Sequence, residues 1–147
     1  MNVLVAVDDS QFTPKVLKAV ASQFRPENTQ VRVIHVLQPL STTPPPQMDA
    51  HYAPELEAQK VRGHKLVEDC GDELRKAGFK VTVHLEIGDV RERIIDSAED
   101  WPADLIVMGS HGRDTVMRFL LGSVAESVAR HAKCSVEIVR APAPGRS

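Results

Sequence analysis

The sequence of 147 residues predicts a single α/β domain built on an open, five-stranded parallel sheet with helices on both faces. Short apolar runs, expected to be strands, alternate with segments whose apolar residues recur at helical spacing. Two runs, 3–7 and 104–108, are almost continuously apolar, which is typical of strands buried on both faces of a sheet. The other runs carry polar or charged residues and should lie further out. The predicted strand order is therefore 3-2-1-4-5.

Composition narrows the range of functions. Hydrophobic residues make up 42% of the chain, enough for one core, and the net charge of −2 with few aromatic residues argues against nucleic acid binding. No apolar run reaches membrane-spanning length and no basic leader precedes the first strand, so we expect a cytoplasmic protein. We expect the domain to cover 1–141 and the tail, 142–147, to be disordered because it has no core residues.

The first strand ends in two carboxylates, Asp8 and Asp9. Either residue could cap the helix that follows, or face a ligand at the carboxyl end of the sheet. The start of that helix is capped either by Ser10 or by Thr13. Its apolar face is expected to consist of Leu17, Val20, Ala21 and Phe24.

The second strand, 31–37, contains His35, which we expect to be structural. A proline-rich loop over 38–54 should follow, because its prolines disfavour both strand and helix; it acts either as a lid or as a passive connector. A surface helix is expected over 55–76.

The third strand, 79–85, alternates apolar and polar residues and should lie at an edge. Asp89 begins a capping-box pattern and is assigned a structural role. The last strand, 136–140, is interrupted by charge and is also expected at an edge. Cys70 and Cys134 fall within apolar patterns and should be buried thiols, and no histidine or cysteine spacing predicts a metal site.

The most informative stretch follows the buried strand 104–108, where glycines precede a new helical pattern. Gly109 and Gly112 allow positive φ and close approach of a ligand, and Gly122 opens the helix. The unpaired N–H groups of a helix start are suited to an anion such as phosphate. An alternative is that Ser123 and Glu126 form an ordinary capping box.

This stretch resembles the nucleotide motif of the universal stress proteins: Gly109, two residues, Gly112, nine residues, then Gly122 and Ser123. The flanking residues, 109–113, 120–126 and 130–132, resemble the same family, and the resemblance covers nearly the whole chain except the 38–54 loop and the tail. It implies a Rossmann-like fold of the nucleotide α-hydrolase type. It also implies membership of the ATP-binding subgroup, with Mg²⁺ or Mn²⁺ held through ATP phosphates and water.

The resemblance further implies individual contacts. The aspartate matching Asp8 lies beside bound adenosine in that family, and the backbone matching Val36 contacts adenine. From their place in the glycine loop, Arg113 or Arg118 would offset phosphate charge or remain a solvated surface charge, and His111 either touches phosphate or orders the loop. No catalytic residue is expected. The expected nucleotide-binding residues are Ala6, Val7, Asp8, Val36, Met108, Gly109, Ser110, His111, Gly112, Arg113, Asp114, Thr115, Gly122, Ser123 and Val124.

Neither a Walker motif nor a dinucleotide fingerprint occurs in the chain. The leading interpretation is an ATP-binding regulatory protein of the stress response, with slow ATP hydrolysis at most, forming a homodimer through residues 135–140 because an open apolar strand edge invites pairing. The alternatives are a dimeric interaction module with a vestigial glycine loop, and an adenylating enzyme of the nucleotide α-hydrolase type.

Overall fold

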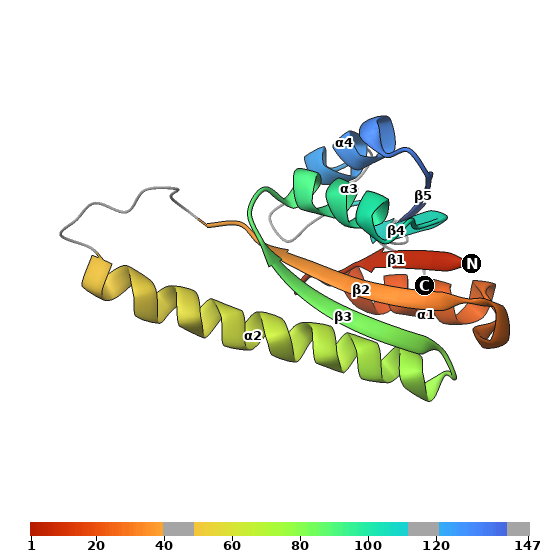
Figure 1. The fold of residues 1–147 in the computed structure, drawn as a ribbon, viewed down its shortest axis with the longest axis horizontal. Helices are drawn as coiled ribbons and strands as arrows, with labels where there is room; N and C mark the ends of the chain where they lie inside the picture. Colours follow the sequence, from red (N-terminus) through yellow and green to blue (C-terminus); the bar gives the residue numbers. More distant parts are fainter. Residues whose placement is uncertain (40–48, 112–120, 141–147) are drawn as a thin grey trace, which may run out of the picture.

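The computed structural model of the protein describes residues 1–39, 49–111 and 121–140. Its sheet has the order β3-β2-β1-β4-β5 and every neighbouring pair is parallel, which confirms the predicted architecture (Figure 1). In chain order, the elements are β1 (Asn2–Ala6), α1 (Thr13–Gln23), the short 3₁₀ helix η1 (Pro26–Asn28), β2 (Gln30–Leu37), α2 (Asp49–Lys76), β3 (Lys80–Ile87), α3 (Val90–Asp100), β4 (Leu105–Gly109), α4 (Ser123–His131) and β5 (Ser135–Val139).

The centre of the sheet is formed by the most apolar strands, β1 and β4. Val3, Leu4 and Val5 are completely buried, and Val5 lies opposite Val107 of β4. Side chains that alternate along a strand point to opposite faces, so these strands need apolar cover on both sides. The strands with polar residues, β3 and β5, occupy the two edges, as predicted.

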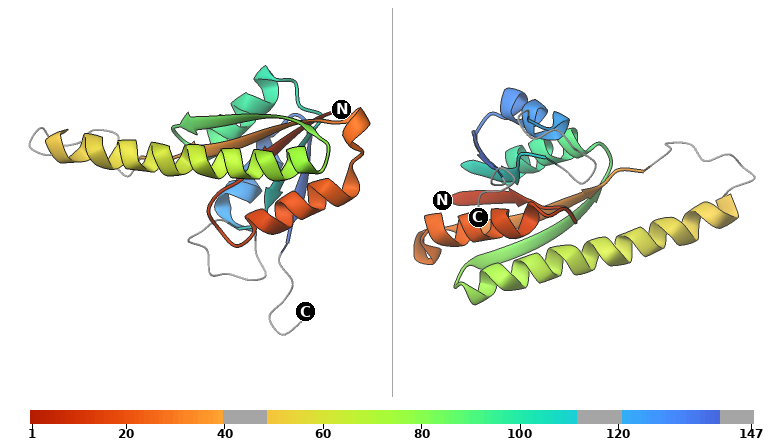
Figure 2. Two further views of the ribbon diagram at one scale, coloured as in Figure 1. Left: turned by 90° about the horizontal axis from the view of Figure 1, so that it is seen from below. Right: turned by 180° about the vertical axis from the view of Figure 1, so that it is seen from behind.

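Two apolar clusters lie on opposite faces of the sheet. Val3 and Val5 belong to a cluster with residues of α1 and α2, whereas Leu4 belongs to a cluster with residues of α3 and α4. Figures 1 and 2 show these two helix pairs as separate layers on either side of the strands. The helix pairs leave the carboxyl ends of the central strands between them.

The longest element, α2, differs from the prediction. It begins at Asp49, so residues 49–54 are helical, although we expected them in the 38–54 loop; residues 40–48 of that loop lie outside the described part. Pro54 is the sixth residue of this helix, so its missing N–H removes a single backbone hydrogen bond, and the helix continues through it. Further along, Gly63 and Gly71 allow α2 to approach β3, because a Cβ atom there would lie 2.8 Å from Leu85 and 2.7 Å from Val83.

The predicted cap is correct for α3 and wrong for α1. Asp89 caps α3, where its Oδ1 accepts the Glu92 N–H at 3.0 Å. For α1, neither Ser10 nor Thr13 is the cap: the N-cap residue is Phe12, without a side-chain cap. Thr13 is already helical and its hydroxyl instead bonds Asp8. The expected apolar face is also shifted, because Ala21 is exposed while Thr13 and Val16 are buried.

Cys70 is buried and Cys134 is half-buried, and both thiols are free. Among the described residues, no helix is long and apolar enough to cross a membrane. The tail 142–147, expected to be disordered, lies outside the described residues.

Candidate functional site

A cavity of about 530 Å³ opens at the carboxyl ends of β1, β2 and β4. Its walls are completed by the starts of α1, α3 and α4. This position lies between β1 and β4, where the chain order in the sheet reverses, and open α/β sheets bind ligands at such switch points. Its volume falls within the range typical of small-molecule and cofactor sites.

Every expected nucleotide-binding residue that the structure describes lies around this cavity. These residues are Ala6, Val7, Asp8, Val36, Met108, Gly109, Ser110, His111, Gly122, Ser123 and Val124. The remaining four, Gly112, Arg113, Asp114 and Thr115, lie outside the described residues, as does Arg118. The structure thus brings the described set together, while nucleotide binding by these residues stays a prediction.

The β1–α1 turn carries Asp8 into the cavity. Asp8 Oδ1 accepts the Ser10 N–H at 2.9 Å, and the Thr13 hydroxyl lies 3.2 Å from the same oxygen. The Thr13 hydroxyl also donates to the Asp8 carbonyl at 2.7 Å and accepts the Asp8 N–H at 3.1 Å. One carboxylate oxygen is therefore committed to the turn, whereas Asp9 is exposed and does not line the cavity.

Gly109 ends β4 directly beside this turn. A glycine allows a positive φ at this position, but among the described glycines only Gly78 and Gly88 adopt one. Its role is close approach instead: a Cβ atom on Gly109 would lie 2.9 Å from the Cβ of Phe12. A side chain at this position would push the end of β4 away from the β1–α1 turn.

The two residues after Gly109 are almost fully enclosed. Ser110 donates its N–H to the Val139 carbonyl at 2.9 Å, and its hydroxyl lies 3.0 Å from His111 Nδ1. His111 is only 8% exposed, and its ring centroid lies 5.8 Å from that of Phe12. Among the described residues, the buried Nε2 atom of His111 has no hydrogen-bond partner, an arrangement that costs free energy unless a partner is supplied.

The start of α4 forms another wall of the cavity. Its N-cap residue is Gly122, so the alternative of a capping box between Ser123 and Glu126 is wrong: no side chain among the described residues caps this helix, and the Glu126 carboxylate pairs with Arg130. The capping box fails because Ser123 is already the first helical residue. The Gly122 N–H donates to the Ser110 carbonyl at 2.7 Å, and this contact holds the helix start against the Gly109–His111 segment.

Gly122 itself is required by this contact. A Cβ atom there would lie 3.0 Å from the Ser110 oxygen and 3.2 Å from His111 Cα. The N–H groups of the first turn, at 123–125, lack a side-chain cap and belong to residues that line the cavity. Unpaired donors at a helix start, together with the positive end of its dipole, favour an anion.

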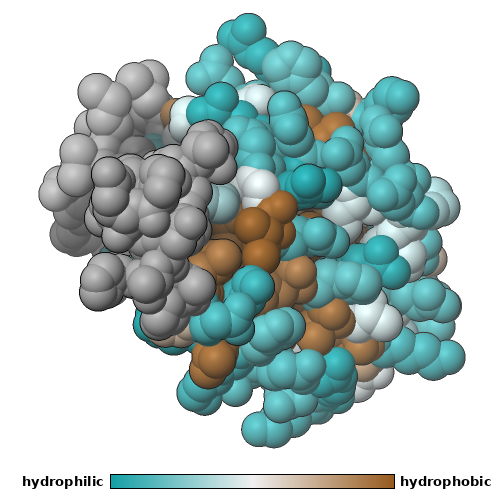
Figure 3. Space-filling model, turned by 60° about the vertical axis from the view of Figure 1, so that its left-hand side comes forward, coloured by the Kyte–Doolittle hydropathy of each residue, from teal (hydrophilic) through white to brown (hydrophobic). Residues whose placement is uncertain are grey.

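The described lining contains little charge. Asp8 is the only carboxylate in it, and it contains no lysine or arginine. Apolar side chains such as Val36, Met108, Val90 and Ile94 provide a surface suited to a flat, apolar group. Figure 3 views the molecule from the side on which α2 begins and shows apolar residues exposed among polar ones, beside residues drawn in grey.

Sequence reasoning missed half of this lining. His35, expected only as a structural residue, does donate from Nδ1 to the Val7 carbonyl at 2.8 Å, but it also borders the cavity. A search of every segment that follows a central strand would have found most of the turn residues, whereas the contributions of α3 depend on how that helix packs. The missed residues are Ser10, Phe12, Thr13, Val16, Ile34, His35, Gln38, Pro39, Val90, Ile94 and Ala125.

Comparison with known proteins places the chain among proteins of this architecture. Residues 1–140 match the model described as the universal stress protein family. A universal stress protein of Synechocystis sp. is 28% identical over 149 residues, covering 95% of this chain and 97% of the relative. The solved structure of the hypothetical protein MJ0577 superposes with a TM-score of 0.85 at 27% identity, covering 97% of this chain and 96% of the other. A universal stress protein of Archaeoglobus fulgidus in complex with dAMP gives a TM-score of 0.65 at 27% identity, covering 95% and 98%.

Proposed function

Because the chain belongs to the universal stress protein family, we propose that its cavity binds ATP and that the protein acts as a regulatory dimer in a stress response. The proposal extends a coarser fact: a relative of the same fold has been solved with dAMP. Binding, rather than turnover, is the central activity.

The observation that carries the proposal is the uncapped start of α4 at the cavity. Its first-turn N–H groups have no side-chain cap, and the Gly109–His111 segment lies directly against Gly122. Phosphate oxygens would satisfy these donors, and one of them could also serve the unpartnered Nε2 of His111. The fit to a nucleotide therefore rests on the donors of a helix start that has no side-chain cap, as well as on the volume of the cavity.

The nucleoside would occupy the other side of the cavity. There Asp8 has one oxygen committed to the turn, so its second oxygen is the candidate acceptor for a ribose hydroxyl. Val36 and Met108 supply apolar surface for adenine. This places adenosine at the ends of β1 and β2 and the phosphates at α4.

A divalent cation, Mg²⁺ or Mn²⁺, would accompany ATP through phosphate oxygens and water. Among the described residues, no group of three or more His, Cys, Asp or Glu side chains could hold a metal ion alone. Magnesium commonly keeps several waters and binds through substrate phosphates, which suits such a site. Arg113 or Arg118 would then share the remaining phosphate charge.

Hydrolysis by such a site should be slow at most. Phosphoryl transfer depends on a positioned base and a metal clamp, and Asp8 is the single carboxylate in the described lining. Asp8 is also tied into the β1–α1 turn, on the nucleoside side of the proposed ligand.

Dimerisation is proposed through residues 135–140. The outer edge of β5 has no neighbouring strand in the described sheet, and an unpaired edge is a ready site for a second copy. Glu137 on this strand has a buried carboxylate oxygen, Oε2, without a hydrogen-bond partner among the described residues. A cation from the second copy, such as its Arg140, could supply one.

The proposal is tested by identifying the nucleotide released when freshly purified protein is denatured, using mass spectrometry. Calorimetry on nucleotide-free protein should then detect ATP binding with Mg²⁺ or Mn²⁺. No ATP in the purified protein and no calorimetric binding would reject the ATP site and favour the interaction module. Rapid exchange of pyrophosphate into ATP would instead indicate an adenylating enzyme.

A further inference from the structure

Phe12 is a buried aromatic residue that neither core cluster accounts for. It is 9% exposed although it lies in the β1–α1 turn, and it belongs to neither of the two apolar clusters that hold the helices on the sheet. A buried ring outside the core requires another explanation. Among the described residues, its contacts include Gly109 and His111 of the cavity wall.

The backbone of Phe12 is fixed by the turn that carries Asp8. Its N–H donates to the Ser10 hydroxyl at 3.2 Å, and its carbonyl accepts the Val16 N–H at 3.0 Å as α1 begins. Ser10 in turn donates its N–H to Asp8. The position of Phe12 is therefore coupled to the nucleoside side of the cavity.

The side chain of Phe12 contacts the neighbouring wall of the cavity, at the end of β4. Gly109 lies so close that a Cβ there would come within 2.9 Å of the Phe12 Cβ and 3.5 Å of its Cγ. The Phe12 ring packs on the His111 ring with centroids 5.8 Å apart and an interplanar angle of 39°. Phe12 thus joins the turn of Asp8 to the segment that bonds the start of α4.

We infer that Phe12 is a positioning residue, which holds His111 and the Gly109–His111 segment at a fixed distance from Asp8. The inference rests on the proposed function, in which phosphates lie at this segment and the nucleoside lies at Asp8. A ligand that spans both walls, such as ATP, depends on their spacing. Adenosine occupies only the nucleoside side, so its affinity does not depend on this spacing.

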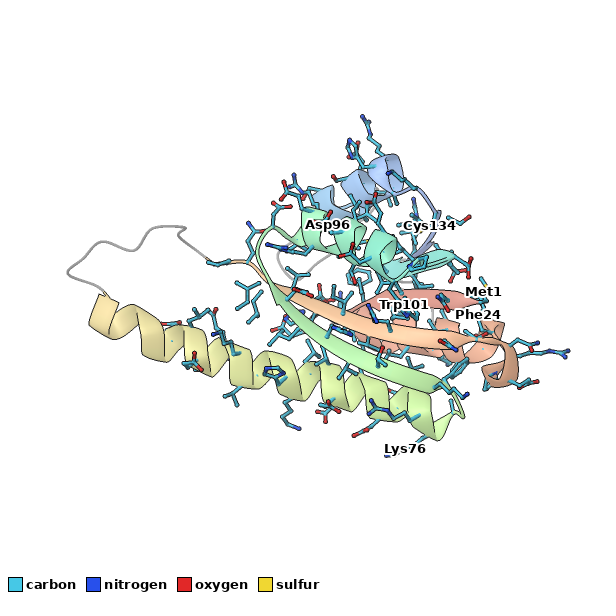
Figure 4. All side chains as sticks on the ribbon, in the orientation of Figure 1. Met1, Phe24, Lys76, Asp96, Trp101 and Cys134 are labelled. Atoms are coloured by element: carbon cyan, nitrogen blue, oxygen red, sulfur yellow. The ribbon has the colours of Figure 1, made fainter. Side chains whose placement is uncertain are left out.

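The test compares Phe12→Leu with Phe24→Leu. Phe24 is the C-cap residue of the same helix, lies at its other end, and packs on the core away from the cavity lining (Figure 4). Affinity for Mg-ATP is measured by calorimetry, and affinity for adenosine by ligand-observed NMR, which detects weak binding. Circular dichroism checks that each variant is folded.

Phe12→Leu should lower ATP affinity about tenfold, the loss expected when one charge-assisted hydrogen bond is misplaced. Adenosine affinity should stay within about threefold of wild type, a change of well under one such bond. Phe24→Leu should leave the ratio of the two affinities unchanged, and Phe12→Tyr, which keeps the ring, should preserve most of the ATP affinity.

Equal losses for ATP and adenosine, or the same shift in Phe24→Leu, would overturn the positioning role while leaving the ATP site intact. Absence of ATP binding by the wild-type protein would overturn both proposals. A measurement on wild type covers the case in which Phe12→Leu does not fold: ATP should shift the ring-proton signals of both Phe12 and His111, whereas adenosine should shift the His111 signals far less than ATP does. Unmoved ring signals on ATP binding would reject the inference.

Discussion

At the scale of single residues, one carboxylate oxygen of Asp8 stabilises the turn and the other is proposed to bind the ribose. Oδ1 accepts the Ser10 N–H at 2.9 Å, and an asparagine at this position would keep an acceptor there. Asp8→Asn should therefore fold normally but lose the charged acceptor proposed for the ribose. We expect ATP affinity to fall about ten- to hundredfold, the value of one hydrogen bond to a charged group.

Asp9→Asn is the matched control, because Asp9 is adjacent, exposed and absent from the cavity lining. Calorimetry should find its ATP affinity close to that of the wild type. If the two variants bind ATP equally well, Asp8 belongs to the turn alone.

The Cys70 thiol should make stability depend on pH in the alkaline range. Burial, with smaller contributions from Glu73, Asp69 and Asp8, raises the pKa of Cys70 from 9.0 to about 11. The folded state thus holds this proton more tightly than the unfolded state, so the stabilisation is complete below pH 9 and is lost as the pH rises from 9 towards 11. A shift of this size corresponds to about 3 kcal/mol, which is the upper limit of the loss.

Denaturant unfolding of wild type and of Cys70→Ala across this pH range provides the measurement. The alanine variant should be less stable at neutral pH, because it leaves a small cavity, but its free energy of unfolding should fall less steeply above pH 9. If the free energies of unfolding of the two proteins depend on pH in the same way, the pKa of Cys70 does not differ between the folded and unfolded states.

Residues differ in how far the sequence predicts them. Asp8 is predictable, because a carboxylate that directly follows a buried strand must lie at the carboxyl edge of the sheet. Phe12 is not, since its significance comes from Gly109 and His111, which are distant in the chain. For Gly109 the sequence predicts a close approach, but it does not show that the neighbour is Phe12, which is distant in the chain.

At the scale of elements, a side chain caps the start of α3 but not that of α4. Removal of a polar side chain should therefore lower the free energy of unfolding at α3 and leave it nearly unchanged at α4. Asp89→Ala removes the oxygen that accepts the Glu92 N–H and should lower the free energy of unfolding by about 0.5–2 kcal/mol. Asp89→Asn can still cap the helix and should be nearly neutral. A neutral Asp89→Ala variant would mean that solvent replaces the cap.

Ser123→Ala should leave stability within about 0.5 kcal/mol of wild type, because Ser123 is exposed and caps nothing. If its hydroxyl contacts phosphate, ATP affinity should fall at the same time. Chemical denaturation and calorimetry on one preparation measure both. A loss of stability without a loss of affinity would restore the capping role that the sequence pattern indicates.

The same elements explain where prediction from sequence succeeds. Strands and their order follow from burial, which apolar runs report directly, so β1 and β4 are predicted at the centre and β3 and β5 at the edges. Helix starts are less certain, because a serine or threonine can cap, bond a turn or face a ligand. Thr13 and Ser123 both illustrate this ambiguity, and α2 extends past a proline that was expected to exclude helix.

At the scale of the whole molecule, the free edge of β5 predicts the assembly. Val136→Lys places a charge on this edge and should convert a dimer into a monomer at micromolar concentration, measured by analytical ultracentrifugation. Val81→Lys on β3 is the control, since both valines are half-buried, lie on edge strands and pack against a core cluster. A wild-type protein that is monomeric at these concentrations would reject the dimer.

The two ends of the sheet also differ in packing. At the amino ends of the strands, side chains pack against one another. For example, the Arg32 guanidinium lies 4.8 Å from the centre of the Trp101 ring, and Trp101 lies beside the strands in Figure 4. At the carboxyl ends the cavity separates the helix layers. Sequence predicts which end carries the site, because glycines and carboxylates follow β1 and β4, but the size of the cavity depends on helix packing.

The length of α2 has a consequence for local unfolding. With 28 residues it is about 42 Å long, whereas the eight residues of its neighbour β3 span about 26 Å. Its first part extends past the sheet (Figures 1 and 2), and Val61 there is 68% exposed, whereas Gly63 and Val67 are buried. An unsupported helical segment of this length is marginally stable in water, so amide hydrogens before Gly63 should exchange with deuterium far faster than those after Val67. If a ligand or partner binds beside the first part of α2, hydrogen exchange in that segment should become slower.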